Sequence, residues 1–216
     1  MKILLTGFEP FGGEQHNPAQ QLARALDGET HESDRIVSGI LPVARYGAIN
    51  AMQQLIDEHQ PQMVVALGVA AGREGITPEK VAINFDDYRI ADNQGNQPMG
   101  EPVVENGPNA YFSTLPINLM VKEMAHLVPA GISFSAGTFV CNHLMYGLMH
   151  HCAQHRPSMR AGFIHVPQAT ENLPPEGAGD LPHLPLAQMI EALERAIFAA
   201  AAHKGDDLKR HAGGTH

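Results

Sequence analysis

The sequence contains little cysteine: its 216 residues include only Cys141 and Cys152. A chain of this size in which 44% of residues are hydrophobic can bury a sizeable core, and it needs no disulfide bond in a reducing compartment. We therefore expect two free thiols and a single domain over residues 1–203. The polar residues 204–216 are expected to form a frayed tail.

Basic residues are also scarce, with 14 Lys and Arg against 23 Asp and Glu and a formal net charge of -9. They form no basic run along the chain. Nucleic-acid binding requires a positively charged surface that neutralises phosphates. The charge distribution therefore argues against nucleic acid as a partner.

Long hydrophobic runs are absent near the start of the sequence. The opening MKILLTGF is interrupted by Glu9 and Pro10, so it is too short for a signal-peptide core or a membrane span. We expect a cytoplasmic protein that does not bind membranes.

Metal-binding motifs are missing as well, because neither HExxH nor CxxC occurs. The densest histidine group, HHCAQH, places His151 and His155 one helical turn apart, which is more typical of a solvated helix end. We therefore expect no metal and no cofactor.

Strand and helix patterns alternate along the chain. Short apolar segments predict strands at residues 2–6, 35–41, 63–68, 131–135 and 160–166. Periodicity and cap residues predict helices at residues 18–26, 44–59, 117–128, 139–155 and 184–202. The polar residues 81–107 predict an extended excursion or hairpin. This order predicts a three-layer α/β/α sandwich around a twisted, largely parallel (mixed) sheet.

Cys141 follows the Ala136-Gly137-Thr138 break and falls in the first turn of the helix predicted for residues 139–155. In sheets of this kind, ligands bind where strands end and helices begin. A helix N-terminus lowers the pKa of a thiol, so Cys141 is a candidate nucleophile. The alternative is a buried apolar role, since free cysteine is among the most frequently buried residues.

A cysteine nucleophile needs a histidine partner, and His165 is the best-placed candidate at the end of the strand predicted for residues 160–166. A core histidine bonded to backbone is equally compatible with that position. Glu79 could orient the imidazole, although its spacing alone favours an ordinary exposed glutamate. His143 is two residues from Cys141 on the helix and points elsewhere, so we expect it to be structural.

The loop TGFEPFGG lies between a strand and a helix but lacks both phosphate-binding glycine patterns. Phe8 and Phe11 suggest an apolar pocket wall, although phenylalanine is ordinarily core filler. Two rival functions remain open: a non-catalytic protein that holds a small anion or nucleoside in this loop, and another type of thiol hydrolase. The latter usually has a GxCxG elbow, which Phe139-Val140-Cys141 does not provide.

Four segments carry a resemblance to a known family: TGFEPFGGEQHNPA, GREGITPEKVAIN, SAGTFVCNHLMY and FIHVP. Together they closely resemble the pyroglutamyl-peptidase I family, also called pyrrolidone-carboxylate peptidases, which are cysteine peptidases. The segments occur in the family's order with similar spacing, and the resemblance extends from the first predicted strand to the last predicted helix.

The resemblance implies a reaction and a set of site residues. The implied reaction removes an N-terminal pyroglutamyl residue from a peptide through a thioester acyl-enzyme, with no cofactor, in an assembly that is commonly a tetramer. The family's nucleophile, histidine and glutamate fall on Cys141, His165 and Glu79. The substrate pocket corresponds to Phe8, Phe11, Asn17, Phe139 and Val140, and we add Arg73 as a candidate oxyanion donor.

Two positions depart from the family pattern. Val69 stands where some members have a glutamine, so a side-chain amide contact to substrate is not expected there. Met145 stands where an aromatic residue is common, which we expect to affect packing behind the nucleophile.

Overall fold

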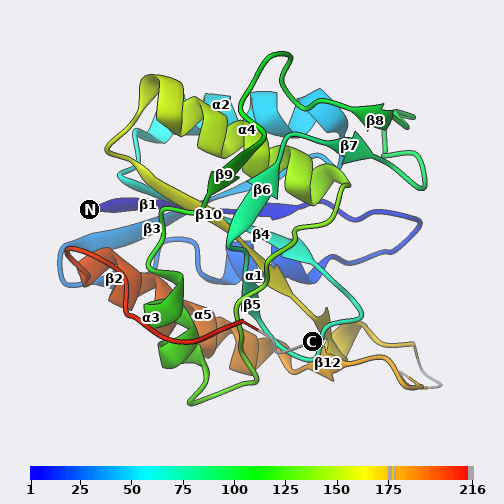
Figure 1. Cartoon of the computed structure of the whole chain (residues 1–216). Coiled ribbons are helices and arrows are strands. Elements are labelled where there is room, and N and C mark those ends of the chain that lie inside the picture. Colours follow the sequence, from blue (N-terminus) through cyan, green and yellow to red (C-terminus); the bar gives the residue numbers. More distant parts are fainter. Residues whose placement is uncertain (175–176, 178, 214–216) are drawn as a thin grey trace.

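The computed structural model describes residues 1–174, 177 and 179–213, which form one α/β domain. Its central sheet has six strands in the order β2-β3-β1-β4-β10-β5 (Figure 1). Their bounds are β1 (Lys2–Phe8), β2 (Thr30–His31), β3 (Asp34–Leu41), β4 (Met63–Val69), β5 (Thr77–Pro78) and β10 (Arg160–Val166). The four inner strands are parallel, whereas β2 and β5 are antiparallel to their neighbours. The predicted largely parallel, mixed sheet is confirmed.

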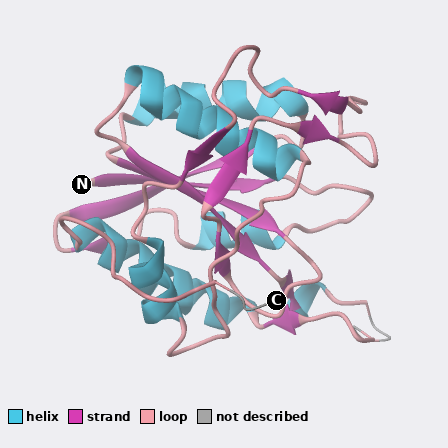
Figure 2. Cartoon of the chain, in the orientation of Figure 1, coloured by secondary structure: helices cyan, strands magenta, loops and turns pink. Residues whose placement is uncertain are grey.

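Five α-helices cover the two faces of this sheet. They are α1 (Pro18–Ala25), α2 (Arg45–His59), α3 (Ile117–Met124), α4 (Val140–His155) and α5 (Leu186–Ala202). Helices α2 and α4 pack together on one face, and α1, α3 and α5 lie on the other (Figures 1 and 2). The predicted three-layer sandwich is therefore confirmed.

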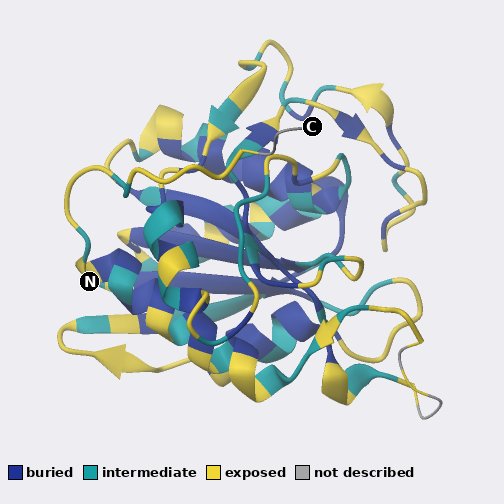
Figure 3. Ribbon diagram, turned by 60° about the horizontal axis from the view of Figure 1, so that its bottom comes forward, coloured by how far each residue is buried: buried dark blue, intermediate teal, exposed yellow. Residues whose placement is uncertain are grey.

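Each face of the sheet buries its own apolar cluster. Along β1, Ile3 and Leu5 contribute to the cluster under α1, α3 and α5, and Leu4 contributes to the cluster under α2 and α4. All three side chains are fully buried, because helices cover both faces of the strand. Figure 3 shows the central strands as the buried interior of the molecule.

Short paired segments decorate the sheet. The polar excursion contains two antiparallel pairs, β6 with β9 and β7 with β8, and β11 pairs with β12 before α5. Their bounds are β6 (Val81–Ile83), β7 (Asp86–Asp87), β8 (Met99–Glu101), β9 (Ala110–Phe112), β11 (Gln168–Ala169), the 3-10 helix η1 (Thr170–Asn172) and β12 (His183–Leu184). The predicted extended excursion is confirmed.

The strand predicted for residues 131–135 is wrong. Only single-residue bridges form there, from Ala130 to Ile76 and from Ser133 to Glu79. Pro129 has no N–H to donate to a ladder and Gly131 weakens one, so regular pairing does not develop. The preceding helix α3 is also shorter than predicted, because it ends at Met124 and a turn follows.

Part of the predicted tail is tied to the domain. The Asp207 carboxylate accepts hydrogen bonds from the backbone N–H of Asn118 (2.8 Å) and of Leu119 (3.1 Å). It thereby satisfies two N–H groups at the start of α3, which the helix itself leaves without acceptors. Residues 214–216 of the predicted tail lie outside the described residues, and the domain boundary at residue 203 stays a prediction.

Candidate active site

The carboxyl ends of β1, β4 and β10 meet the start of α4 at one edge of the sheet. In the parallel ladder between β4 and β10, Gly68 is the partner of His165 and Val69 is the partner of Val166. Side chains of paired residues project to the same face of a sheet. Position 68 and the His165 imidazole therefore share a face.

Cys141 lies over this pair of strands. A Cβ atom built at Gly68 would be 3.0 Å from the Cys141 sulfur and 2.6 Å from Cζ of Phe163, so position 68 tolerates only glycine without rearrangement. The Phe163 ring lies on the same face, with its centroid 4.9 Å from that of His165. The missing side chain at Gly68 thus lets the sulfur settle onto the sheet beside the strand that carries His165.

His165 is bonded to Glu79 through its inner ring nitrogen. The Nδ1 atom is 2.6 Å from Oε1 of Glu79, and Glu79 is fully buried. The backbone N–H of Glu79 donates to the Phe163 carbonyl at 2.8 Å, which fixes the glutamate beside β10. Because a carboxylate accepts, Nδ1 carries the proton and Nε2 keeps a free lone pair.

The pKa values of the pair follow from burial and mutual attraction. Burial alone would raise the pKa of Glu79, but the hydrogen bond to His165, the nearby Ser133 hydroxyl and the Arg73 charge together bring it below its ordinary value. For His165, burial lowers the pKa and outweighs the attraction to Glu79, which raises it. Glu79 is therefore ionised and His165 neutral at neutral pH.

Arg73 is bonded to Glu79 and does not line the pocket. Its guanidinium lies 2.6 Å from Oε1 of Glu79, donates to the Ser135 carbonyl at 3.0 Å and bonds the Thr77 hydroxyl. With these three acceptors engaged it is absent from the residues that line the pocket. These contacts favour a role in positioning Glu79, and the oxyanion role of Arg73 stays an untested prediction.

The thiol of Cys141 has a raised pKa. Burial raises it to about 12, and the negative charge of Glu79 acts in the same direction. The prediction that the helix start would lower this pKa is therefore wrong for the free protein. At neutral pH the Cys141 thiol and the His165 imidazole are therefore both neutral in the resting protein.

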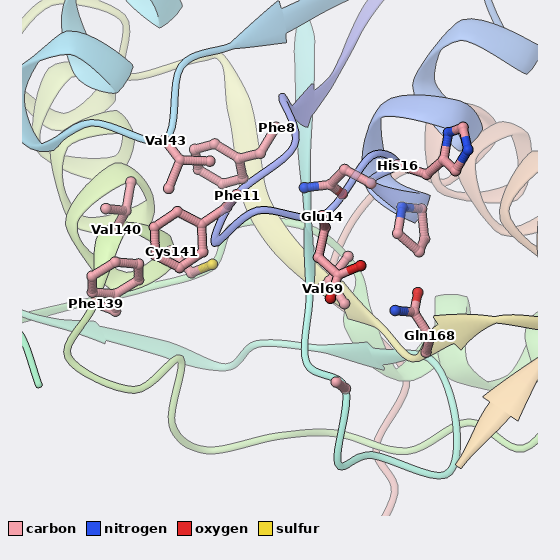
Figure 4. A pocket seen from close by; sticks show the side chains of 13 residues that line it. Phe8, Phe11, Glu14, His16, Val43, Val69, Phe139, Val140, Cys141 and Gln168 are labelled. Carbon is pink, nitrogen blue, oxygen red and sulfur yellow. The ribbon is translucent and has the colours of Figure 1, made fainter. Parts of the chain in front are cut away.

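A pocket of about 320 Å³ opens above the sulfur, within the size range of small-molecule sites. Figure 4 shows Cys141 with aromatic and aliphatic side chains gathered on one side and polar side chains on the other. The apolar side chains are Phe8, Phe11, Val43, Phe139 and Val140. Of the predicted substrate-binding residues, all except Arg73 line this pocket.

The aromatic rings at the apolar end support one another. The Phe11 and Phe139 centroids are 5.3 Å apart, and Tyr88 packs behind Phe139 at 4.6 Å. Val69 adds a further apolar wall. Met145 is fully buried in the core under α2 and α4, in agreement with the packing role expected for it.

Asn17 lines the pocket but uses both ends of its amide within the chain. Its oxygen accepts from the N–H of Ala19 at 2.9 Å, and its nitrogen donates to the Glu9 carbonyl at 2.9 Å. The first bond caps α1 and the second closes the loop that carries Phe11. These contacts favour a loop-positioning role over direct substrate recognition.

The start of α4 is anchored by Asn142, which the sequence patterns did not single out, and by His143. Asn142 is buried and exchanges hydrogen bonds with both backbone groups of Ile83 and with the Phe85 carbonyl, each at 3.0 Å. His143 Nδ1 lies 2.7 Å from the buried carboxylate of Asp86, which confirms its structural role. The polar pair Asn142-His143 next to Cys141 was the only sequence signal for this anchoring. Their bonding partners could not be predicted, because they lie more than 50 residues away in the sequence.

Two kinds of feature are absent from the described residues. No group of three or more His, Cys, Asp or Glu side chains is arranged to hold a metal ion. Within the same residues, no helix is long and apolar enough to cross a membrane.

Comparison with known proteins gives consistent matches over the whole chain. The model of the family described as pyroglutamyl peptidase matches residues 1–203. The pyrrolidone-carboxylate peptidase of Vibrio vulnificus is 44% identical over 215 residues, which cover 99% of this chain and 98% of the relative.

Two solved structures extend this similarity to the fold. The crystal structure of pyroglutamyl peptidase I from Bacillus amyloliquefaciens has a TM-score of 0.91 at 44% identity and covers 96% of this chain and 99% of its own. The pyrrolidone carboxyl peptidase of Thermococcus litoralis has a TM-score of 0.91 at 35% identity, with 97% and 99% covered.

Proposed function

Because the chain belongs to the pyroglutamyl peptidase family, we propose that it removes N-terminal pyroglutamyl residues from peptides and amides with Cys141 as nucleophile. The observation that carries this proposal is the position of Cys141 in a pocket with one aromatic end, over the strand β10 that holds His165, whose ring is bonded to the buried Glu79. The non-catalytic rival does not account for a histidine bonded to a buried glutamate at this site, and the absence of a GxCxG elbow disfavours the other thiol hydrolases.

The aromatic end suits the pyroglutamyl ring. This lactam is compact and neutral, because cyclisation removes the ammonium group that other N-terminal residues carry. Phe8, Phe11 and Phe139 offer apolar faces on which such a ring can lie, and no carboxylate is needed there to bind a cation. A free ammonium would lose its hydration at this aromatic end without gaining a partner, which disfavours substrates with ordinary N-termini.

The first chemical step joins the sulfur to the substrate carbonyl carbon. Nε2 of His165 accepts the thiol proton while the S–C bond forms, because the raised pKa of Cys141 keeps the thiol neutral until then. The carbonyl oxygen becomes an oxyanion next to the start of α4. That helix has no side-chain cap, so its first N–H groups are available as donors. One such donor is typically worth about 3 kcal/mol in the transition state.

The second step releases the amine. As the C–N bond breaks, the His165 imidazolium donates its proton to the leaving nitrogen, and a thioester remains on Cys141. His165 then accepts a proton from water, which attacks the thioester and frees pyroglutamate. Glu79 holds the ring through Nδ1 and stabilises its transient charge, and Arg73 holds Glu79.

A pair of fluorogenic substrates tests this function. Pyroglutamyl-aminomethylcoumarin should be hydrolysed, and glutamyl- and prolyl-aminomethylcoumarin should be cleaved at least about a hundredfold more slowly, because each brings a cationic nitrogen into the pocket. Comparable rates on the three compounds would contradict the proposal.

We also propose a cellular location, a cofactor requirement and an oligomeric state. The protein acts in the cytoplasm and needs no cofactor. The family resemblance further leads us to expect a homotetramer. Equilibrium sedimentation of the purified chain measures the last of these directly.

A further inference from the structure

The pocket has a second end that the pyroglutamyl ring does not need. Glu14, His16 and Gln168 line it, on the far side of Cys141 from the Phe11 and Phe139 rings (Figure 4). Given the proposed function, the part of the substrate that follows pyroglutamate must lie somewhere beyond the sulfur. The polar end is the open space next to it.

The direction of the leaving group follows from the proton donor. The departing nitrogen receives its proton from His165, so it must face β10. From His165 the chain runs through Val166 and Pro167 to Gln168, whose side chain lines the pocket. The residue attached to that nitrogen therefore extends toward Gln168 and toward Glu14 in the facing loop.

Gln168 offers a hydrogen-bond donor at this end. Its Oε1 accepts from the N–H of Ala169 at 3.0 Å, and its side-chain nitrogen points into the pocket (Figure 4). An amide N–H₂ matches a peptide carbonyl such as the one of the residue that follows pyroglutamate.

Glu14 supplies the charge. It lies in a loop turned by Gly12 and Gly13, which both have left-handed φ values (68° and 86°), and its N–H donates to the Phe11 carbonyl at 3.2 Å. Among the described residues that line the pocket, Glu14 is the one carboxylate and there is no lysine or arginine. No salt bridge engages it within the described part of the chain.

We propose that this polar end binds the residue following pyroglutamate, with Gln168 donating to its carbonyl and Glu14 favouring a cationic side chain over an acidic one. The inference rests on the proposed function and deepens it by naming the preferred substrates: pyroglutamyl peptides whose second residue is basic. The expected preference for a basic second residue is small, because Glu14 is exposed and water and salt screen its charge.

The test compares amidated dipeptides that differ only in the second residue. For wild type, kcat/KM for pyroglutamyl-lysine amide should exceed that for pyroglutamyl-glutamate amide by roughly two- to tenfold at low ionic strength. The ratio should fall toward one in about 0.5 M NaCl and in the variant Glu14→Gln. Glu29→Gln, which removes the same charge at the opposite edge of the sheet, should keep the wild-type ratio.

A second variant tests the hydrogen bond. Gln168→Ala should lower kcat/KM for the dipeptide amides relative to pyroglutamyl-aminomethylcoumarin by roughly two- to tenfold, since the coumarin amide lacks the peptide carbonyl. The inference is overturned if wild type hydrolyses the coumarin substrate but the lysine-to-glutamate ratio is one, or if Glu14→Gln leaves that ratio unchanged. If wild type does not hydrolyse pyroglutamyl-aminomethylcoumarin at all, the proposed function fails and the inference fails with it.

Discussion

Glu79 uses its two carboxylate oxygens unequally. Oε1 is bonded to both His165 and Arg73 at 2.6 Å, and the buried Oε2 has no hydrogen-bond partner within the described structure. The single shared oxygen couples the charge of Arg73 to the orientation of the imidazole. Glu79 thus sets the tautomer of His165 and raises its pKa against the larger effect of burial.

Replacing Glu79 by glutamine should lower kcat by roughly 10²- to 10⁴-fold, because the imidazole loses its orienting anion. The acid limb of kcat/KM should also move to lower pH. Neutral His165 is the active form, so activity rises as pH passes its pKa, and the Glu79 charge raises that pKa. Removing the charge lowers it further.

The measurement is the pH profile of kcat/KM from about pH 4 to 8, which spans the ordinary histidine pKa. In wild type the acid limb should have its midpoint below 6.5, the ordinary value for the histidine. An upward shift in Glu79→Gln, or an unchanged profile, would contradict the assigned roles.

At the scale of elements, the site depends on the seating of α4 against β4. The sulfur approaches the sheet because residue 68 is a glycine, and the helix is held by Asn142 on the segment that follows β6. The sequence predicted α4 and β4 closely, since helical periodicity and an apolar run are local signals. It could not predict their contact, because the spacing of two distant segments is set by tertiary packing.

Gly68→Ala should reduce kcat at least about tenfold while the protein still folds. The added Cβ would meet the Cys141 sulfur at 3.0 Å and the Phe163 ring at 2.6 Å, so the sulfur must shift from the attacking position. Gly131→Ala is the matched control, since a Cβ there meets nothing within 4 Å. Steady-state kinetics measure kcat, and circular dichroism checks that each variant folds. Full activity in Gly68→Ala would contradict the claim that a Cβ at residue 68 displaces the sulfur.

Asn142→Ala should destabilise the protein by about 1–3 kcal/mol, because it leaves buried backbone groups without partners. It should also lower kcat, since the first turn of α4 loses its tie to Ile83 and Phe85. Urea unfolding and steady-state kinetics measure the two effects. Unchanged stability would mean that water replaces the amide and that α4 is held by other contacts.

At the scale of the molecule, one sheet joins two apolar cores. Adjacent residues of β1 enter different cores, so neither core can lose its packing while the sheet stays intact. The α/β/α layering was predictable because it follows from the order of strands and helices. The missing strand at residues 131–135 was not, because its apolar letters fit a strand locally but Pro129 and Gly131 leave only isolated bridges.

The proposed catalytic residues show the same limit. Residues alone left His165 undecided and favoured an exposed Glu79, because burial depends on contacts made across the fold. The pKa of Cys141 was predicted in the wrong direction, since a local rule about helix starts cannot register the desolvation that the assembled pocket imposes.

Because one sheet joins both apolar cores, thermal unfolding should occur in one transition. Far-ultraviolet circular dichroism, which follows the helices of both faces, and near-ultraviolet circular dichroism, which follows tyrosine packing, should give the same midpoint. Separate midpoints would indicate that the two cores unfold independently.

The attack by the Cys141 sulfur is the central claim, and its removal is the most direct test. Cys141→Ala should release no coumarin from pyroglutamyl-aminomethylcoumarin while its circular dichroism spectrum stays native, and Cys152→Ala should remain near wild type because that thiol is buried in the core. Measurable turnover by the folded Cys141→Ala variant would contradict the account.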